Sequence, residues 1–135
     1  MNADILARYG ETEPILSEAN LSYCLWAALR EAKKHKVDFH RIWAAETLHQ
    51  IAVKHPFGEG NKRTSYVVAK LILRLGKYDF EVPYDDSTVH YLKKIAAGKV
   101  QQDEIYQWIH RYAKKTEEKP SAEIRAFINL LEKVT

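Results

Sequence analysis

Two stretches with helical periodicity are separated by a short loop rich in proline and glycine, residues 55–60. Apolar residues recur on one helix face before the loop, at Ala44, Leu48, Ile51 and Ala52, and after it, at Val68, Leu71, Ile72 and Leu75. Pro56 prevents simple continuation of the first helix, and Asn61 is a good N-cap for the second. The sequence therefore predicts two helices joined by a tight loop, with Gly76 ending the second helix.

The rest of the chain is also mainly helical in pattern. We expect four further helices: from about Glu18 to Lys34, from Asp85 to Gly98, around Ile105–Tyr112, and from Ser121 onward. The helices on either side of Gly98 should pack against the helix that follows the loop. The alternating run Tyr78–Pro83 is short and ends in proline, so it is interpreted as an extended connection. The predicted fold class is all-α, a compact bundle with the loop between two central helices.

Composition limits the classes of function. A chain of 135 residues with 46% hydrophobic content fits one domain with a real core. The net charge of +3 suits a nucleotide or an acidic peptide, but nucleic acid is not indicated. Cys24 lies in an apolar helical pattern, so we expect a buried thiol in a reducing compartment. No segment resembles a signal peptide or reaches the roughly 20 apolar residues of a membrane span, so we expect a cytoplasmic protein.

The start of the helix after the loop has the chemistry of a phosphate site. A helix N-terminus exposes unpaired backbone N–H groups and a partial positive charge, and Lys62 and Arg63 add two full charges. Gly58 and Gly60 allow backbone conformations that are closed to other residues. Taken alone, however, the two cations would be an ordinary solvated helix face.

The loop itself adds a base and a carboxylate. His55 can deprotonate a hydroxyl near neutral pH, and Glu59 beside phosphates can ligate Mg²⁺. Phe57 is the expected apolar anchor of the loop. A single histidine after a helix is usually structural, so the prediction depends on the ordered combination of these residue types.

Residues 55–63 resemble the signature of the Fic/Doc (Fido) family: His-Pro-Phe, any residue, Asp or Glu, Gly-Asn, Gly or Lys, and Arg. Lys62 and Thr64 make the run similar to the Doc (death-on-curing) branch of toxin–antitoxin toxins. Weaker likeness at Leu75–Tyr78 and Ala96–Val100 extends the resemblance over roughly residues 20–113. It implies a Fido domain over residues 1–115. Residues 116–135 lie beyond the resemblance, and their pattern predicts a charged linker and an amphipathic helix that packs on the core, with an oligomer contact or a docking site for a partner as the alternatives.

The resemblance also implies roles for matching residues. His55 would accept the proton of a target hydroxyl, and Glu59 would hold Mg²⁺. The groups that would bind the phosphates of ATP are Gly58, Gly60, Asn61, Lys62 and Arg63.

One departure from the family pattern bears on the reaction. The adenylyl-transferring branch has a second Arg three residues after the first, and this chain has Tyr66 there. Together with Lys62, this favours the Doc-type reaction, transfer of the ATP γ-phosphate to a Thr or Ser hydroxyl of a protein such as elongation factor Tu. The alternatives are a Fic-type adenylyltransferase (AMPylation) and a non-catalytic Fido-like binding module.

The family also suggests how such a protein is controlled. Its inhibitory-helix motif, Ser or Thr, three residues, then Glu followed by Gly or Asn, does not occur in this sequence. The resemblance therefore implies inhibition in trans by a Phd-like antitoxin. The flap that aligns the target would lie in Gly10–Pro14 or in Lys34–Asp38, and the sequence does not choose between them.

Other residues suited to metal or base binding have simpler interpretations. Three histidines lack the i, i+4 pairing with a carboxylate expected of a helix-borne metal site: His35, His40 and His49. The tryptophans lie in helical apolar patterns typical of a core or an interface: Trp26, Trp43 and Trp108.

Overall fold

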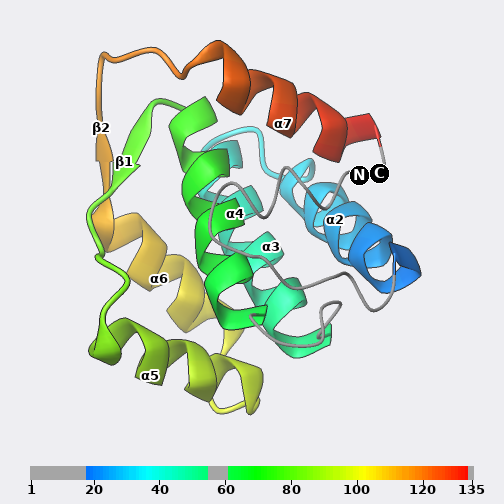
Figure 1. Cartoon of the computed structure of the whole chain (residues 1–135), viewed down its shortest axis with the longest axis vertical. Helices are drawn as coiled ribbons and strands as arrows, with labels where there is room; N and C mark the ends of the chain where they lie inside the picture. Colours follow the sequence, from blue (N-terminus) through cyan, green and yellow to red (C-terminus); the bar gives the residue numbers. More distant parts are fainter. Residues whose placement is uncertain (1–17, 55–60, 134–135) are drawn as a thin grey trace.

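The computed structural model of the chain describes residues 18–54 and 61–133 (Figure 1). Its elements, in order, are α2 (Glu18–Ala32), α3 (Phe39–Lys54), α4 (Asn61–Leu75), β1 (Tyr78–Phe80), α5 (Asp86–Ala96), α6 (Gln102–Tyr112), β2 (Ala113–Lys115) and α7 (Ala122–Lys133). Helices dominate, so the all-α class predicted for a Fido-type bundle is confirmed. None of the helices in the described part of the chain is long and apolar enough to cross a membrane.

Helix α3 is the central element of the bundle. It packs against α2, α4, α5 and α6, and it therefore has buried residues around most of its circumference. Leu48 and Ile51 are fully buried, and burying a side chain of this size contributes roughly 1.5–3 kcal/mol. The two helices that flank residues 55–60 are thus held side by side by the core, as the periodicity predicts.

Helix α4 ends where predicted, but for a different reason. A Cβ atom added to Gly76 would lie 2.5 Å from Cγ of His40 at the start of α3, so glycine is required by the close approach of the two helices. The left-handed residue is Lys77, with φ of 63°, and its N–H donates to the carbonyl of Arg74. Gly76 is therefore a packing residue, and Lys77 makes the turn.

The run Tyr78–Pro83 was interpreted from sequence as an extended connection, and this is wrong for its first three residues. Strand β1 pairs antiparallel with β2, with Tyr78 opposite Lys115 and Phe80 opposite Ala113. The sequence of β2 has no apolar alternation, so only its partner, far away in the chain, makes it a strand. The short sheet lies at the edge of the helical bundle (Figure 1).

The later helices cover the two central ones. The side chain of Asp85 accepts a hydrogen bond from the N–H of Thr88 at 3.0 Å and so caps the start of α5, and Gly98 follows this helix with φ of 75°. Helix α5 packs on both α3 and α4, whereas α6 packs mainly on α3 and not, as expected, on the helix after the loop. Helix α7 follows Ser121, whose Oγ accepts from the N–H of Ile124, and lies against α4 and α2.

Candidate functional site

The described structure places the helices on both sides of the predicted phosphate loop. Helix α3 ends at Lys54 and α4 begins at Asn61, so residues 55–60 connect two packed helices. Five predicted site residues lie outside the described residues, and their roles stay predictions: His55, Phe57, Gly58, Glu59 and Gly60.

The first turn of α4 has a buried side and a cationic side. Thr64 and Ser65 are buried, and Ser65 Oγ donates to the carbonyl of Lys62 at 2.7 Å. Lys62 is partly exposed and Arg63 is exposed, and neither forms an ion pair with a carboxylate of the described residues. The first turn contains no acidic residue. The helix start therefore combines a helix N-terminus with two cations, which is a combination that suits an anion.

Tyr66, at the position of the second arginine, is part of the framework. Its hydroxyl donates to the backbone carbonyl of Val82, and its ring lies 5.9 Å from that of Phe80 and 5.2 Å from that of Tyr84. The ring is almost fully buried, and this burial raises the pKa of the phenol. Tyr66 therefore ties α4 to the segment after β1 and supplies no positive charge at this position.

A basic groove runs along the outer face of α4, with a volume of about 690 Å³. Arg63 lies 6.0 Å from the ring centroid of Tyr84, and Lys70 lies 5.8 Å from that of Tyr66. Arg74, at the far end, donates to Asp79 and to the carbonyl of Glu118, both at 3.2 Å. None of the described residues lining the groove is acidic. The sequence analysis missed this groove, although the spacing of its three cations already places them on one helix face.

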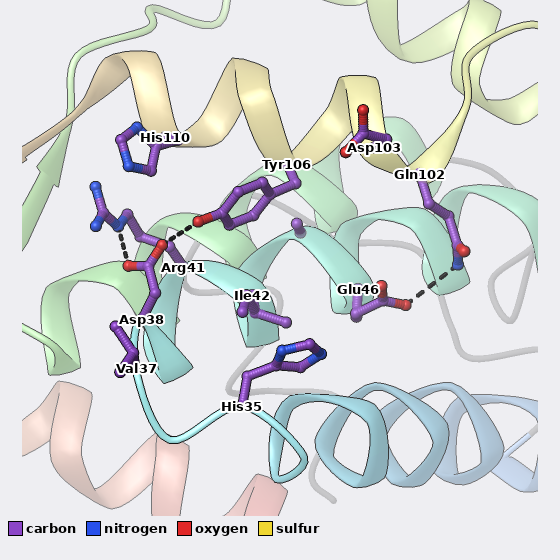
Figure 2. A pocket seen from close by; sticks show the side chains of 11 residues that line it. His35, Val37, Asp38, Arg41, Ile42, Glu46, Gln102, Asp103, Tyr106 and His110 are labelled. Atoms are coloured by element: carbon purple, nitrogen blue, oxygen red, sulfur yellow. Dashed lines mark hydrogen bonds and ion pairs between the residues drawn. The ribbon is translucent and has the colours of Figure 1, made fainter.

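A second group of charged residues lies at the opposite end of α3. Asp38 pairs with Arg41 and accepts a hydrogen bond from the hydroxyl of Tyr106 on α6 (Figure 2). Burial and the neighbouring Asp38 raise the pKa of Tyr106 to about 12. A cavity of about 680 Å³ opens beside these residues, between the α2–α3 turn and α6. The three side chains satisfy one another and fasten α6 to the turn.

The same cavity continues along α3 to Glu46. Gln102 Nε2 donates to Glu46 Oε2 at 3.2 Å and lies 3.3 Å from Nδ1 of His49. Burial, followed by the charge of Glu31, raises the pKa of Glu46, while burial lowers that of His49. The side chains of Glu46, Gln102 and His49 are therefore bound to one another, as those of Asp38, Arg41 and Tyr106 are.

The position of this cavity also bears on the flap. The segment Lys34–Asp38 precedes α3, whereas the predicted catalytic loop follows it. A helix of 16 residues is about 24 Å long, so this segment lies far from the loop. The other segment considered, Gly10–Pro14, lies outside the described residues, so the position of the flap stays a prediction.

The remaining sequence candidates are mostly structural. The part of the chain described here contains no group of three His, Cys, Asp or Glu side chains able to hold a metal. Cys24 is buried as predicted, its Sγ donates to the carbonyl of Gln50, and burial raises its pKa to about 11. Trp43 lies in the core and Trp108 packs on Phe80, but Trp26 is exposed.

Comparison with known protein families gives a match to part of the chain. Residues 7–73 match the model of the Fic/DOC family, a segment that includes α2, α3, the loop and nearly all of α4. No curated protein matches the chain. The family match supports a Fido-type enzyme, and transferase activity in the broad sense. The weaker likenesses after Leu75 fall outside the matched segment.

Proposed function

From the premise that residues 7–73 form a Fic/DOC-family segment, we propose that the chain is a Doc-type phosphotransferase acting in the cytoplasm. The observation that carries this choice is the state of Tyr66. A buried tyrosine bound to the carbonyl of Val82 cannot grip the distal phosphates of ATP, which is the task of the second Arg in adenylyl-transferring members. The cations that remain at the start of α4 are Lys62 and Arg63.

The proposed reaction transfers the γ-phosphate of ATP to a Thr or Ser hydroxyl of a protein such as elongation factor Tu. The hydroxyl oxygen forms a bond to the γ-phosphorus, the bond to the β,γ-bridging oxygen breaks, and ADP leaves. His55 takes the hydroxyl proton. Asn61, Lys62, Arg63 and the backbone of Gly58 and Gly60 bind the phosphates.

The donor set at the start of α4 fits the phosphates of a nucleotide. Two cations without ion-pair partners and a helix N-terminus meet there, and no acidic side chain lies in this turn. In the proposal Glu59 holds Mg²⁺, which supplies additional neutralisation of phosphate charge.

Inhibition by a Phd-like antitoxin is part of the proposal. The basic groove beside Tyr84 begins at Arg63, so an acidic antitoxin segment bound in it would cover a phosphate-binding residue. Co-expression of an antitoxin should relieve toxicity of the chain in its host, and harmless expression of the active chain alone would argue against the toxin role.

The reaction is tested by incubating the purified chain with Mg²⁺, a cytosolic extract and ATP labelled separately at the α- and γ-phosphate. We expect transfer of the γ-label only, and we expect His55→Ala to abolish it. Transfer of the α-label would show adenylyl transfer instead. Absence of both labels from all proteins would favour a binding module.

A further inference from the structure

The face of α2 that points to solvent carries large aromatic residues. Tyr23 is 49% exposed and Trp26 is 41% exposed, while Cys24, Leu25 and Ala28 on the other face are buried in the core. An amphipathic helix normally presents polar residues on this outer face. Exposed aromatic side chains grouped together often mark a binding surface.

These aromatic residues form a continuous row with two cations. Lys54 Nζ lies 5.6 Å from the ring centroid of Tyr23, the rings of Tyr23 and Trp26 are 6.1 Å apart, and Arg30 Cζ lies 5.1 Å from the Trp26 centroid. We call these four residues the α2 row. Neither Lys54 nor Arg30 pairs with a carboxylate of the described residues, so both ends of the row carry uncompensated positive charge.

A groove of about 450 Å³ runs beside the α2 row, between α2, α3 and the start of α6. Its lining includes two carboxylates, Glu31, which pairs with Lys34 at 3.0 Å, and Glu46. Such carboxylates repel a continuous polyanion. They permit a ligand whose negative charges are few and spaced, with apolar side chains between them.

The location of the row links it to the predicted catalytic loop. Lys54 is the last residue of α3, and the predicted catalytic loop begins at the next residue of the chain. A segment bound along the row would therefore end beside the proposed general base.

We infer that the α2 row docks an acidic segment of the protein substrate, with spaced carboxylates on Arg30 and Lys54 and an apolar side chain against Trp26 and Tyr23. This inference rests on the proposed function for the identity of the partner as substrate. The types of residue agree with it, because Trp, Tyr and Arg dominate the binding energy of protein interfaces. The docked segment brings a neighbouring hydroxyl to His55.

The direct test is binding of a fluorescein-labelled peptide of alternating acidic and leucine residues, followed by fluorescence polarisation without nucleotide. We expect Arg30→Glu to weaken binding at least about tenfold, as removal of an interface hot spot does. Trp26→Ala should weaken it similarly and leave the core intact, because the side chain is exposed. Matched controls are Arg111→Glu and Tyr112→Ala on α6, also exposed, which should bind as the unchanged chain does.

Three results of this experiment would overturn the inference. The first is equal binding of a peptide with Gln and Asn in place of the acids. The second is loss of binding in Lys70→Glu but not in Arg30→Glu, which would place the peptide in the basic groove of α4. The third is tighter, Arg30-dependent binding of an oligothymidylate, which would make the row a nucleic-acid surface.

A second assay separates this inference from the proposed function. The acidic peptide should inhibit γ-label transfer to extract proteins by the unchanged chain, and Arg30→Glu should transfer less label. If transfer occurs but responds to neither change, the inference fails and the function stands. If no protein is labelled while peptide binding still depends on Arg30, the function fails and the row stands as a surface for acidic segments.

Discussion

The two ends of α3 carry charged residues in opposite states. At its start, Asp38, Arg41 and Tyr106 are bound to one another between packed elements, and we call this the closed end. At the other end, Lys54 and, across the loop, Lys62 and Arg63 have no carboxylate partner among the described residues. We call this the motif end.

This difference distinguishes charged residues that stabilise the fold from charged residues that remain available to a ligand. A mostly buried ion pair such as Asp38–Arg41 uses its electrostatic energy within the fold, and breaking it leaves a charge without compensation. An exposed cation near a helix N-terminus costs the fold little and remains available to an anionic ligand. The closed end should therefore respond to mutation through stability, and the motif end through activity.

The largest effect is expected at the motif end. Arg63→Gln removes a cation from the proposed phosphate site and should lower the rate of γ-label transfer by about 100-fold or more. The melting temperature should hardly change, because Arg63 is exposed. Lys93→Gln, on the exposed face of α5, is the control for general loss of positive charge. If Arg63→Gln instead lowered the melting temperature strongly and left γ-label transfer normal, Arg63 would be a structural residue like those of the closed end.

At the closed end, Asp38→Asn should lower the free energy of unfolding by about 3 kcal/mol, because it leaves Arg41 without its carboxylate. Asparagine also tolerates the positive φ of 68° at this position, so backbone strain is not added. Urea denaturation measures the change. Asp103→Asn, exposed beside the same cavity, should be nearly neutral. Equal effects of the two substitutions would show that the ion pair is not what stabilises this end.

A somewhat smaller loss of folding stability is expected from a substitution at Gly76, where α3 and α4 approach closely. Gly76→Ala places a Cβ against the ring of His40 and should cost about 2 kcal/mol, a usual value for overpacking. In a His40→Ala background the same substitution should cost clearly less, which a double-mutant cycle measures. Additive effects would mean that the contact between these two residues does not limit the helix spacing.

The smallest expected effect is on the dependence of folding stability on pH. Burial, and then the charge of Lys115, lowers the pKa of His40 below its ordinary value of 6.5. Below that value the unfolded chain binds more protons than the folded one, so stability should fall as the pH is lowered through this range. His40→Gln should reduce the pH dependence of the melting temperature, and His90→Gln, exposed on α5, should not. An unchanged slope in the His40 variant would contradict this account.

Local patterns in the sequence predicted most of the elements. The periodicity around Leu48 and Ile72 identified the two central helices, and the polar run 85–87 was correctly placed at the start of α5, where Asp85 is the residue that caps the helix. Strand β2 was missed because Ala113–Lys115 has no strand pattern of its own and pairs only with a distant segment. Gly76 was correctly associated with a helix end, but its contact with His40 depends on how two helices cross.

The sequence by itself determined the helical class of this protein and predicted an ordered set of phosphate-binding residues, because periodicity and motif order are local properties of the chain. The motif singled out Arg63, but no local pattern could show which cations are paired with a carboxylate, since Arg41 and Arg63 both lie near the start of a helix. Only the tertiary structure decided that Asp38 and Tyr106 lie beside the first arginine and that the second faces a groove whose described lining contains no carboxylate. The physical reason is that the partner of a charge is set by which distant segments the packed core brings together.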